Sequence, residues 1–433
     1  MSLFIVSMTI LGLLVFTLGS TVWVGISLFL VGMGGFLFFT SSPVFIILSN
    51  ILWNSTHSST MMALPLFVFM GEILFRSKIS ENLFKGLSPW VDKIPGRLMH
   101  VNIVACALFA AVSGSSAATT ATVGKITVPE LDKRNYSRKL YLGSLAGAGT
   151  LGFLIPPSMM MLVYGMMAEV SIGRLFMAGI IPGILLAGAF SGYIIIRSLK
   201  NPNYTPRGEE KYTWNDRIKT IPLLFPVIAL IVMVLGSIYT GWATPTEAAA
   251  VGVLGSLFFA WLSRSMNKRI FMDALLGSVK TSCMIMLIVA GASFLSVAVG
   301  YLGIPGKLTQ FIGTLGLSKY FLIIILSVLY IILGTLLDGF SMIVMSLPLA
   351  LPLILAAGFD PLWFGIYLVI MIGAAQITPP VGFNLFVING LTDEDVFTIA
   401  YYALPSFLII LGVVVLITIY PEIVLVLPKM MVK

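Results

Sequence analysis

Residues 140–168 read LYLGSLAGAGTLGFLIPPSMMMLVYGMMA, and residues 362–390 read LWFGIYLVIMIGAAQITPPVGFNLFVING. Each stretch is apolar along most of its length and is interrupted by two consecutive prolines, Pro156-Pro157 in the first and Pro379-Pro380 in the second. Two adjacent prolines remove two backbone N–H donors and clash with the preceding helical turn, so a helix cannot continue undisturbed through them. Each stretch is therefore predicted to be a broken helix.

The two interrupted stretches are related by a duplication. One shift of 223 residues carries every proline between positions 125 and 183 onto another proline: Pro129 onto Pro352, Pro156 onto Pro379, Pro157 onto Pro380 and Pro182 onto Pro405. Because proline makes up about 5% of residues in proteins, such matches at a single shift are rare by chance. The chain is predicted to be two copies of one unit, separated by the polar stretch 200–219.

The composition places this duplicated chain in a membrane. Of its 433 residues, 58% are apolar and 10% are charged, whereas a soluble domain carries about 25% charged residues. This balance excludes a soluble enzyme, a disordered chain and a nucleic-acid-binding protein. Apolar stretches of about 20 residues, the length that a spanning helix needs, recur along the chain. They predict an all-α polytopic membrane protein, and the net charge of +8 is attributed to basic cytoplasmic loops.

The loop charges predict an orientation. Lysine and arginine are concentrated in 76–97, 130–139 and 197–219, whereas 353–362, the counterpart of 130–139, carries only Asp360. Because basic loops remain in the cytoplasm, the first three loops are predicted to lie inside and the fourth outside. The two copies are then inverted relative to each other, and both termini lie in the periplasm.

The same rule predicts two re-entrant helical hairpins. Both loops that flank 98–132 are cytoplasmic, so this segment must enter the membrane and return, with its tip at the SGSS sequence of 113–116. Its counterpart, 320–353, dips in from the outside, with its tip near Leu337-Asp338-Gly339. Inverted repeats that each contain a broken helix are typical of secondary transporters.

Broken helices bring partly positive helix N-termini and partly negative bare carbonyl groups to the middle of the bilayer. The first suit an anionic substrate and the second suit Na⁺. A first Na⁺ site is predicted at the first hairpin tip and the turn before the first break, from Ser113, Gly114, Ser115, Ser116, Gly149, Thr150 and Gly152. A second is predicted in the other copy, from Asp338, Gly339, Ser341, Gly373, Gln376 and Thr378.

Both clusters have a structural alternative. Small residues in membrane helices are enriched where helices pack closely, and each serine or glycine taken singly fits that role. Asp338 has two interpretations: an ionisable group at membrane depth is usually functional, and an aspartate before a helix is a good N-cap. One carboxylate can fill both roles.

The substrate is predicted to lie beside the same breaks. No arginine occurs in 98–132 or 320–353, so a bound acid would be held by helix N-termini and hydroxyl groups, or by an arginine from elsewhere. Asn389 follows the second break and is a further candidate. The expected substrate contacts are Ser116, Thr119, Pro156, Pro157, Ser158, Pro379, Pro380 and Asn384.

Two other classes of protein compete with a transporter. An ion channel also uses broken helices, but channels usually build a filter from several subunits around an axis, and an inverted repeat within one chain argues against that. An intramembrane serine protease would use Ser115 or Ser116 with His57 or His100 as base. His100 lies at the basic cytoplasmic boundary of its segment, however, and the chain has no H-E-x-x-H motif for a metalloprotease.

Several stretches resemble the large membrane subunit of tripartite ATP-independent periplasmic (TRAP) transporters. They run in order through nearly the whole chain: ALPLF at 63–67, MGE at 70–72, HVN at 100–102, SGSSA at 113–117, IPPS at 155–158, TPTEAAA at 244–250, LD at 337–338 and TPPVG at 378–382. The chain departs from the family shortly after the first tip. Many members carry an acidic residue there, whereas this chain has Thr119 and Thr120.

The resemblance implies a Na⁺-driven importer of an organic acid, such as sialic acid or a dicarboxylate, in the bacterial inner membrane. It implies two protein partners, a soluble periplasmic binding protein that delivers the substrate and a small four-helix membrane subunit. It also implies a fold of the ion-transporter superfamily and an elevator mechanism, and it implies no enzymatic activity.

On that picture the chain divides into scaffold and moving parts. The scaffold is expected at 1–97 and 220–319, and the moving part at 98–199 and 320–433. Residues 200–219 are expected to form a cytoplasmic linker between the two halves.

Overall fold

The computed structural model describes residues 3–20, 22–57, 59–206, 212–314, 318–335 and 337–431, and within these ranges it contains helices and no strand. The first half comprises α1 (Leu3–Gly19), α2 (Val24–Phe39), α3 (Val44–Thr56), α4 (Ser59–Arg76), α5 (Ile79–Val91), α6 (Met99–Ser113), α7 (Ser116–Lys133), α8 (Arg138–Gly149), α9 (Leu151–Leu154), α10 (Met159–Met167), α11 (Ile172–Lys200) and the 3₁₀ turn η1 (Pro202–Tyr204). The second half comprises α12 (Trp214–Tyr239), α13 (Pro245–Leu262), α14 (Lys268–Tyr301), α15 (Ile304–Thr314), α16 (Lys319–Gly334), α17 (Gly339–Ala356), α18 (Pro361–Ala375), α19 (Phe383–Asn389), α20 (Val396–Ile419) and α21 (Glu422–Met430).

The helices form a membrane protein. Six of them are long and apolar enough to cross a bilayer, namely α11, α12, α13, α14, α17 and α20, and α8–α9 with α10 form a seventh candidate span that is bent by 42°. Large apolar side chains remain exposed on the outer surface, among them Phe38 (72%), Trp242 (88%) and Trp261 (70%). Water would penalise apolar surface of this extent, whereas lipid does not. The predicted all-α polytopic fold is confirmed.

The helix boundaries repeat at the shift of 223 residues that relates the prolines. Helix α7 covers 116–133 and α17 covers 339–356, so both of their ends match. The ends of α2 and α13, at Phe39 and Leu262, and of α5 and α15, at Val91 and Thr314, are also 223 residues apart. The duplication thus includes the N-terminal helices, which the prolines did not mark. One difference stands out, because α14 is continuous where the first half divides into α3 and α4.

The two broken helices run in opposite directions. Arg138, the first residue of α8, pairs with Glu394 just before α20 begins, with Nη1 and Oε1 3.3 Å apart. Trp363, in the first turn of α18, donates from Nε1 to the carbonyl of Ile417 near the end of α20, over 2.8 Å. Helix α20 has 24 residues and is therefore about 36 Å long. Helices α8 and α18 thus start about one membrane thickness apart.

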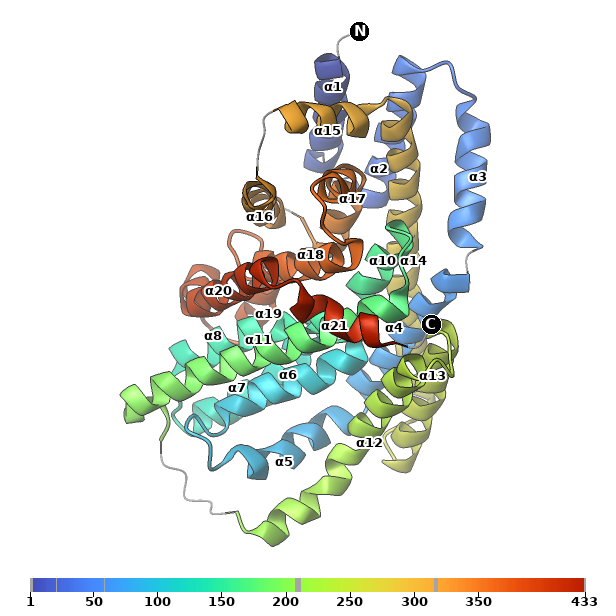
Figure 1. Ribbon diagram of the computed structural model, residues 1–433. Coiled ribbons are helices and arrows are strands. Elements are labelled where there is room, and N and C mark those ends of the chain that lie inside the picture. Colours follow the sequence, from blue (N-terminus) through green and yellow to red (C-terminus); the bar gives the residue numbers. More distant parts are fainter. Residues whose placement is uncertain are drawn as a thin grey trace.

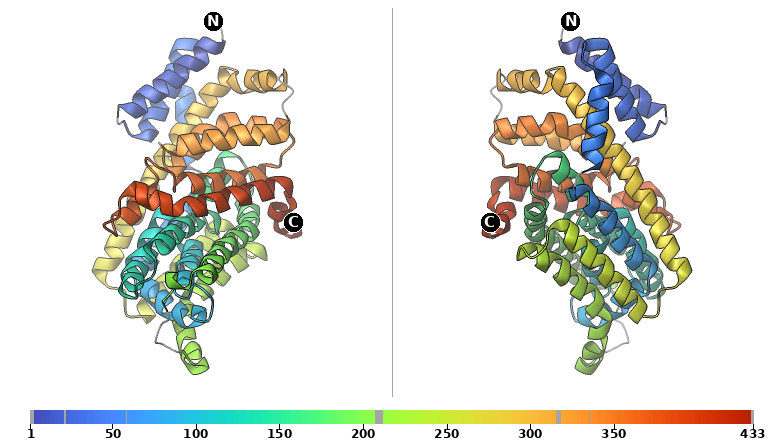
Figure 2. Two further views of the ribbon diagram at one scale, coloured as in Figure 1. Left: turned by 90° about the vertical axis from the view of Figure 1, so that its left-hand side faces the viewer. Right: turned by 90° about the vertical axis from the view of Figure 1, so that its right-hand side faces the viewer.

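The helices that were predicted to form the scaffold are interlocked between the two halves. Helix α2 packs along α14, and its counterpart α13 packs along α4, so each pair takes one helix from each half. Glycines permit the close approach: a Cβ on Gly32 would lie 2.7 Å from the ring of Phe294, and one on Gly252 would lie 2.5 Å from the sulfur of Met70. Helix α14 passes along one side of the molecule and connects the upper helices with α12 and α13, as Figures 1 and 2 show.

The stretch 200–219, predicted as a linker, is partly helical. Helix α12 begins at Trp214, after a capping box in which the backbone N–H of Asp216 donates to Thr213 Oγ1 (3.3 Å) and Asp216 Oδ2 accepts from the N–H of Thr213 (2.8 Å). The spacing of these two residues in the sequence is the capping-box signature. Arg217 then donates from Nε to the carbonyl of Pro89 (3.1 Å), which holds the start of α12 against α5. Residues 207–211 lie outside the described part.

A glycine-to-alanine pair tests the packing of α8 on α20. A Cβ on Gly143 would collide with the backbone carbonyl of Tyr402, whereas a Cβ on Gly188 in α11 meets nothing within 4 Å. We expect Gly143→Ala to lower the free energy of unfolding by about 1–3 kcal/mol, because neither backbone can yield easily. Gly188→Ala should leave stability unchanged or raise it by up to about 1 kcal/mol, since alanine favours a helix.

Thermal unfolding of the two purified variants in detergent compares them directly. Equal stability of Gly143→Ala and Gly188→Ala would show that α8 and α20 do not approach this closely.

Candidate functional site

The first helix break is held in place by the first hairpin tip. Helix α9, which continues α8, ends at Leu154, and the chain then turns through Pro156-Pro157. Helix α10 begins at Met159, and the Ser158 hydroxyl caps it by accepting from the N–H of Met161 (3.4 Å). At the tip, the N–H of Met159 donates to the carbonyl of Gly114 over 3.4 Å. The hairpin tip leaves the Gly114 carbonyl without a helical partner, and the helix break leaves the Met159 N–H without one. The hydrogen bond between them therefore satisfies both groups.

Two glycines make this contact possible. Gly114 ends α6 with φ +61°, a conformation that favours glycine, and a Cβ there would lie 3.0 Å from the carbonyl of Pro157. A Cβ on Gly152 would lie 2.7 Å from the carbonyl of Ser115. The tip and the turn before the break therefore pack backbone against backbone. The structure brings together the predicted residues 113–116 and Gly152.

A buried set of hydroxyl and amide groups surrounds this contact. The hydroxyls of Ser113 and Thr119 lie 2.9 Å apart. Ser116 Oγ donates to Asn384 Oδ1 over 2.9 Å, and Asn384 Nδ2 donates to the carbonyl of Ala146 over 3.3 Å. These polar side chains are all buried. Asn384 belongs to α19, so a residue that follows the second break completes the cluster around the first.

Thr120 is a polar residue of this cluster that the sequence analysis did not include among the site residues. Its side chain is fully buried, and its Oγ1 has no hydrogen-bond partner among the described residues. It lies against Gly149, where any Cβ would collide with that Oγ1. A buried hydroxyl without a partner is costly in an apolar interior. The departure of Thr119-Thr120 from the family pattern was the one sequence signal that pointed here.

The second hairpin tip is organised by Asp338. Its carboxylate accepts from the backbone N–H of Phe340 (3.0 Å), from that of Ser341 (3.4 Å) and from the Ser341 hydroxyl. Asp338 is therefore the N-cap of α17, which is one of its two predicted roles. The following residue, Gly339, packs against α18 and α10, where a Cβ would lie 2.7 Å from Ile372 and from Met160.

The two predicted clusters touch at Thr150 and Gly373. A Cβ on Gly373 would lie 3.1 Å from Cβ of Thr150, so the turn before the first break touches the helix before the second. Thr150 Oγ1 donates to the carbonyl of Gly147 (2.7 Å), and Thr378 Oγ1 donates to that of Ala375 (2.8 Å). The side chain of Gln376 is buried, and its backbone carbonyl accepts from the N–H of Asn384 over 3.2 Å.

The two breaks differ in exposure. Pro156, Pro157 and Ser158 are buried, whereas Pro379 is half-buried and Pro380 is exposed. The contact between Met159 and Gly114 has no recorded equivalent between Gly382 and Leu337, the corresponding residues of the second half. Leu336 lies outside the described residues. The predicted substrate contacts therefore fall into a buried group around Ser116, Thr119 and Asn384 and a more open group at the second break.

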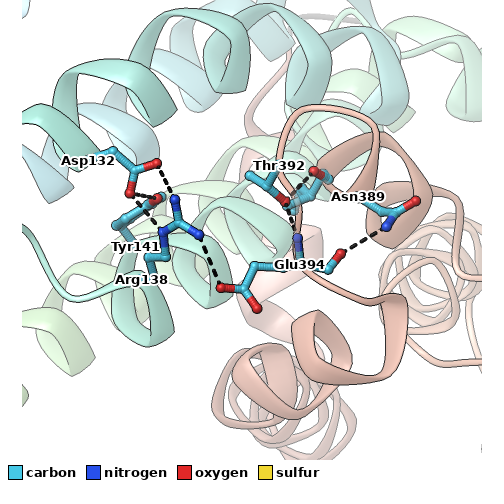
Figure 3. Close-up of polar contacts among 7 residues, drawn as sticks. Asp132, Arg138, Tyr141, Asn389, Thr392 and Glu394 are labelled. Carbon is cyan, nitrogen blue, oxygen red and sulfur yellow. Dashed lines mark hydrogen bonds and ion pairs between the residues drawn. The ribbon is translucent and has the colours of Figure 1, made fainter.

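A polar network joins the two halves at the base of the first hairpin (Figure 3). Arg138 donates from Nε and Nη2 to the carboxylate of Asp132, 2.9 Å each, and Tyr141 donates to the same carboxylate over 2.7 Å. Arg138 also pairs with Glu394. Asn389 donates to the backbone carbonyl of Glu394 over 2.8 Å. Asn389, named above as a possible substrate contact, therefore takes part in this network.

The network is electrostatically favourable above acidic pH. Burial alone would raise the pKa of Asp132, but the hydrogen bonds from Arg138 and Tyr141 and the charge of Arg138 outweigh burial and lower this pKa. The contribution to stability is therefore present above the pKa of an unfolded aspartate and is lost as the pH falls through the lowered value.

The described residues contain no group of three or more His, Cys, Asp or Glu side chains that could hold a metal ion. A cation at either cluster would therefore be held by hydroxyl, amide and carbonyl oxygens, with Asp338 as the one carboxylate among the predicted ligands. Such oxygens at broken helices suit Na⁺.

Fold and site together define a polytopic helical membrane protein whose two broken helices run in opposite directions and touch at Thr150 and Gly373. Over residues 10–423 the chain matches the family described as "Tripartite ATP-independent periplasmic transporter, DctM component". The chain belongs to this family of TRAP transporter large permease subunits, as the resemblance predicted.

Relatives with known names support this assignment. The chain is 34% identical over 381 residues to the C4-dicarboxylate TRAP transporter large permease protein DctM of Pseudomonas aeruginosa, covering 87% of this chain and 88% of that protein. It is 28% identical to the sialic acid TRAP transporter large permease protein SiaM of Vibrio cholerae, covering 94% and 95%. It is 32% identical to the isethionate TRAP transporter permease protein DctMQ of Oleidesulfovibrio alaskensis, of which it covers 59%. These proteins are transporter permeases and not enzymes, and the same holds for this chain.

A solved structure supports the fold. The YdaH transporter of Alcanivorax borkumensis superposes with a TM-score of 0.63 at 13% sequence identity, over 87% of this chain and 88% of that one. At this level of identity the likeness shows the fold alone.

A double-mutant cycle tests whether Asn384 joins the two breaks. We expect Ser116→Ala and Asn384→Ala to be non-additive, with a coupling of about 0.5–3 kcal/mol in the free energy of unfolding, because each removes the partner of a buried polar group. Ser282→Ala is the control, since the Ser282 hydroxyl is buried and has no hydrogen-bond partner among the described residues, and it should leave stability unchanged or raise it. Additive effects, measured by unfolding in detergent, would contradict the contact.

Proposed function

We propose that the protein is the large permease subunit of a Na⁺-coupled importer of an organic acid, working by an elevator mechanism. The observation that carries this proposal is the meeting of both clusters at Thr150 and Gly373. Two broken helices of opposite direction touch there, and a site placed between such helices can be exposed to either side in turn.

The oxygen atoms of the two clusters support Na⁺ coupling. In the first cluster, the Thr120 hydroxyl lacks a partner, and a bound cation would supply one. In the second, Asp338 brings a negative charge beside the start of α17. We therefore propose Thr120 and Asp338 as the Na⁺ ligands to test first.

The helix N-termini and the relatives support an acidic substrate. Helix α7 begins at the first hairpin tip and α10 begins at the first break, with Ser115 and Ser158 as their N-caps. The N-terminus of a helix attracts anions. The relatives' names specify C4-dicarboxylates, sialic acid, isethionate and ectoine, and each of these compounds carries a carboxylate or sulfonate group. We propose a solute of this kind, bound near Ser116, Thr119 and Asn384.

The division of the fold supports the elevator proposal and the two partners. Helices α2, α4, α13 and α14 form an interlocked frame. Helices α8 and α18 pack on α20, and the two hairpins contact the frame through α6 on α4 and α17 on α14. We propose that a small membrane subunit braces this frame and that a periplasmic binding protein delivers the substrate. The name DctMQ of one relative is in keeping with a second membrane component. A channel remains the alternative, and saturable uptake that requires a Na⁺ gradient excludes it.

Two substitutions test the ion sites. Asp338→Asn removes the charge of Asp338 but keeps an N-cap, because asparagine caps helices as well as aspartate does. We expect it to raise the half-saturating Na⁺ concentration by about tenfold, which corresponds to about 1.4 kcal/mol of lost binding. Thr120→Val removes the unpartnered hydroxyl at nearly constant volume, so it should weaken Na⁺ dependence and should maintain or raise the stability of the Na⁺-free protein.

The measurement is uptake of succinate, sialic acid and isethionate into proteoliposomes that contain the small subunit and the matching binding protein. Ser282→Ala serves as the control for a hydroxyl outside both clusters. A Na⁺ response like that of the unsubstituted protein in either Asp338→Asn or Thr120→Val, at normal expression, would remove that residue from the ion site.

Cysteine labelling tests the proposed orientation. With Cys106 and Cys283 replaced by serine, Lys133→Cys and Asp393→Cys should both react with a membrane-impermeant maleimide from the cytoplasmic side. Ala356→Cys, which corresponds to Lys133 in the other copy, should react from the periplasmic side. The expectation follows from the opposite directions of α8 and α18. Labelling of positions 133 and 356 from one side would overturn the inverted arrangement.

A further inference from the structure

A cleft with a volume of about 710 Å³ lies between the first hairpin and the scaffold. One wall is the second half of α7, and the other is formed by α5 and the start of α12. Volumes of 300–1,000 Å³ are typical of sites for small organic molecules. The cleft lies beside the basic loops 76–97, 130–139 and 197–219, which the proposed orientation places in the cytoplasm.

The charges of the cleft favour an anion. Lys85, Lys125, Arg134 and Lys219 line it together with Glu81, Glu130 and Asp216. Glu130 and Arg134 pair with each other at 3.6 Å, which leaves three lysines against Glu81 and Asp216, and the Asp216 carboxylate also accepts two hydrogen bonds from Thr213.

Among the described residues, none of the three lysine side chains makes a recorded ion pair or hydrogen bond to a carboxylate. The ammonium groups of Lys85, Lys125 and Lys219 therefore come from both walls and outnumber the two carboxylates, Glu81 and Asp216, that remain outside the Glu130–Arg134 pair. They are exposed, so water and salt keep each single contact weak. Several such groups around one cleft act together on a ligand with more than one negative charge.

Helix α7 connects this cleft with the proposed substrate site. Ser116 and Thr119 lie at its start, and Lys125 lies nine residues after Ser116 on the same helix, a distance of about 14 Å along the axis. The hairpin wall belongs to the part that we propose to move, and α5 and α12 belong to the scaffold. Movement of one against the other would change the width of the cleft.

We propose that this cleft is a cytoplasmic vestibule that binds a soluble organic anion through Lys85, Lys125 and Lys219. It would hold the carboxylate groups of the imported acid after release from the central site. This role rests on the proposed function, whereas the binding of an anion to the cleft does not.

The test compares two triple variants that lose the same charge. In the first, Lys85, Lys125 and Lys219 are changed to glutamine. In the control, Lys78, Lys133 and Lys200, which are exposed and lie outside the cleft, are changed to glutamine. Binding of succinate and of citrate to the purified full-length chain is measured in detergent, without Na⁺ and without a binding protein, by the shift in melting temperature.

We expect citrate and succinate to stabilise the unsubstituted protein and the control equally, and to bind the cleft variant about tenfold more weakly. High salt should reduce this difference. Lys125→Gln alone should show a smaller loss in the same direction, and it provides the comparison if the triple variant is poorly expressed.

Equal anion binding by both triple variants would overturn the proposal. So would stabilisation by phosphatidylglycerol but not by citrate, because that result would assign the cleft to a lipid headgroup. Failure of the proposed function has a different signature: uptake would not depend on Na⁺ in any variant, while the binding measurement, made without Na⁺, would be unchanged.

Discussion

The constraint that governs this structure is the need to satisfy backbone groups where a helix is interrupted in an apolar interior. Each orphaned N–H or C=O costs several kcal/mol in lipid. The chain meets this constraint by placing one interruption against another, so that the N–H of Met159 donates to the carbonyl of Gly114. Glycine at positions 114 and 152 is required, because a side chain would separate the two backbones.

The polar centre follows from this arrangement. Because the interruptions pack together, the small polar residues next to them also lie close to one another. Asn384, from the second copy, joins this cluster by hydrogen bonds to the Ser116 hydroxyl and the Ala146 carbonyl of the first copy. At Thr120 the hydroxyl is buried without a hydrogen-bond partner among the described residues, so this is a place where a polar group is enclosed but not satisfied. An ion site needs such a group, because oxygen atoms that already have hydrogen-bond partners within the protein are less available as ligands.

Much of the fold could be predicted because proline acts locally. A Pro-Pro pair breaks a helix whatever surrounds it, so the two broken helices and the duplication were evident from position alone. The capping signatures at Thr213 and Asp338 are equally local. The packing of α2 along α14 and of α13 along α4 could not be predicted. These contacts join glycines and side chains that are far apart in the sequence, and no local or periodic sequence pattern identifies such pairs.

By itself, the sequence determined the class of protein, the number of copies and the positions of the breaks and hairpin tips, because composition and backbone chemistry decide these. Only the tertiary structure decided that Asn384 completes the first cluster, that Thr150 meets Gly373, and that Asn389 serves a network with Arg138 and Glu394. Apart from the local hydrogen bond between Asn389 and Glu394, these contacts join residues more than 200 positions apart. Their geometry depends on how two whole copies pack, which no local pattern specifies.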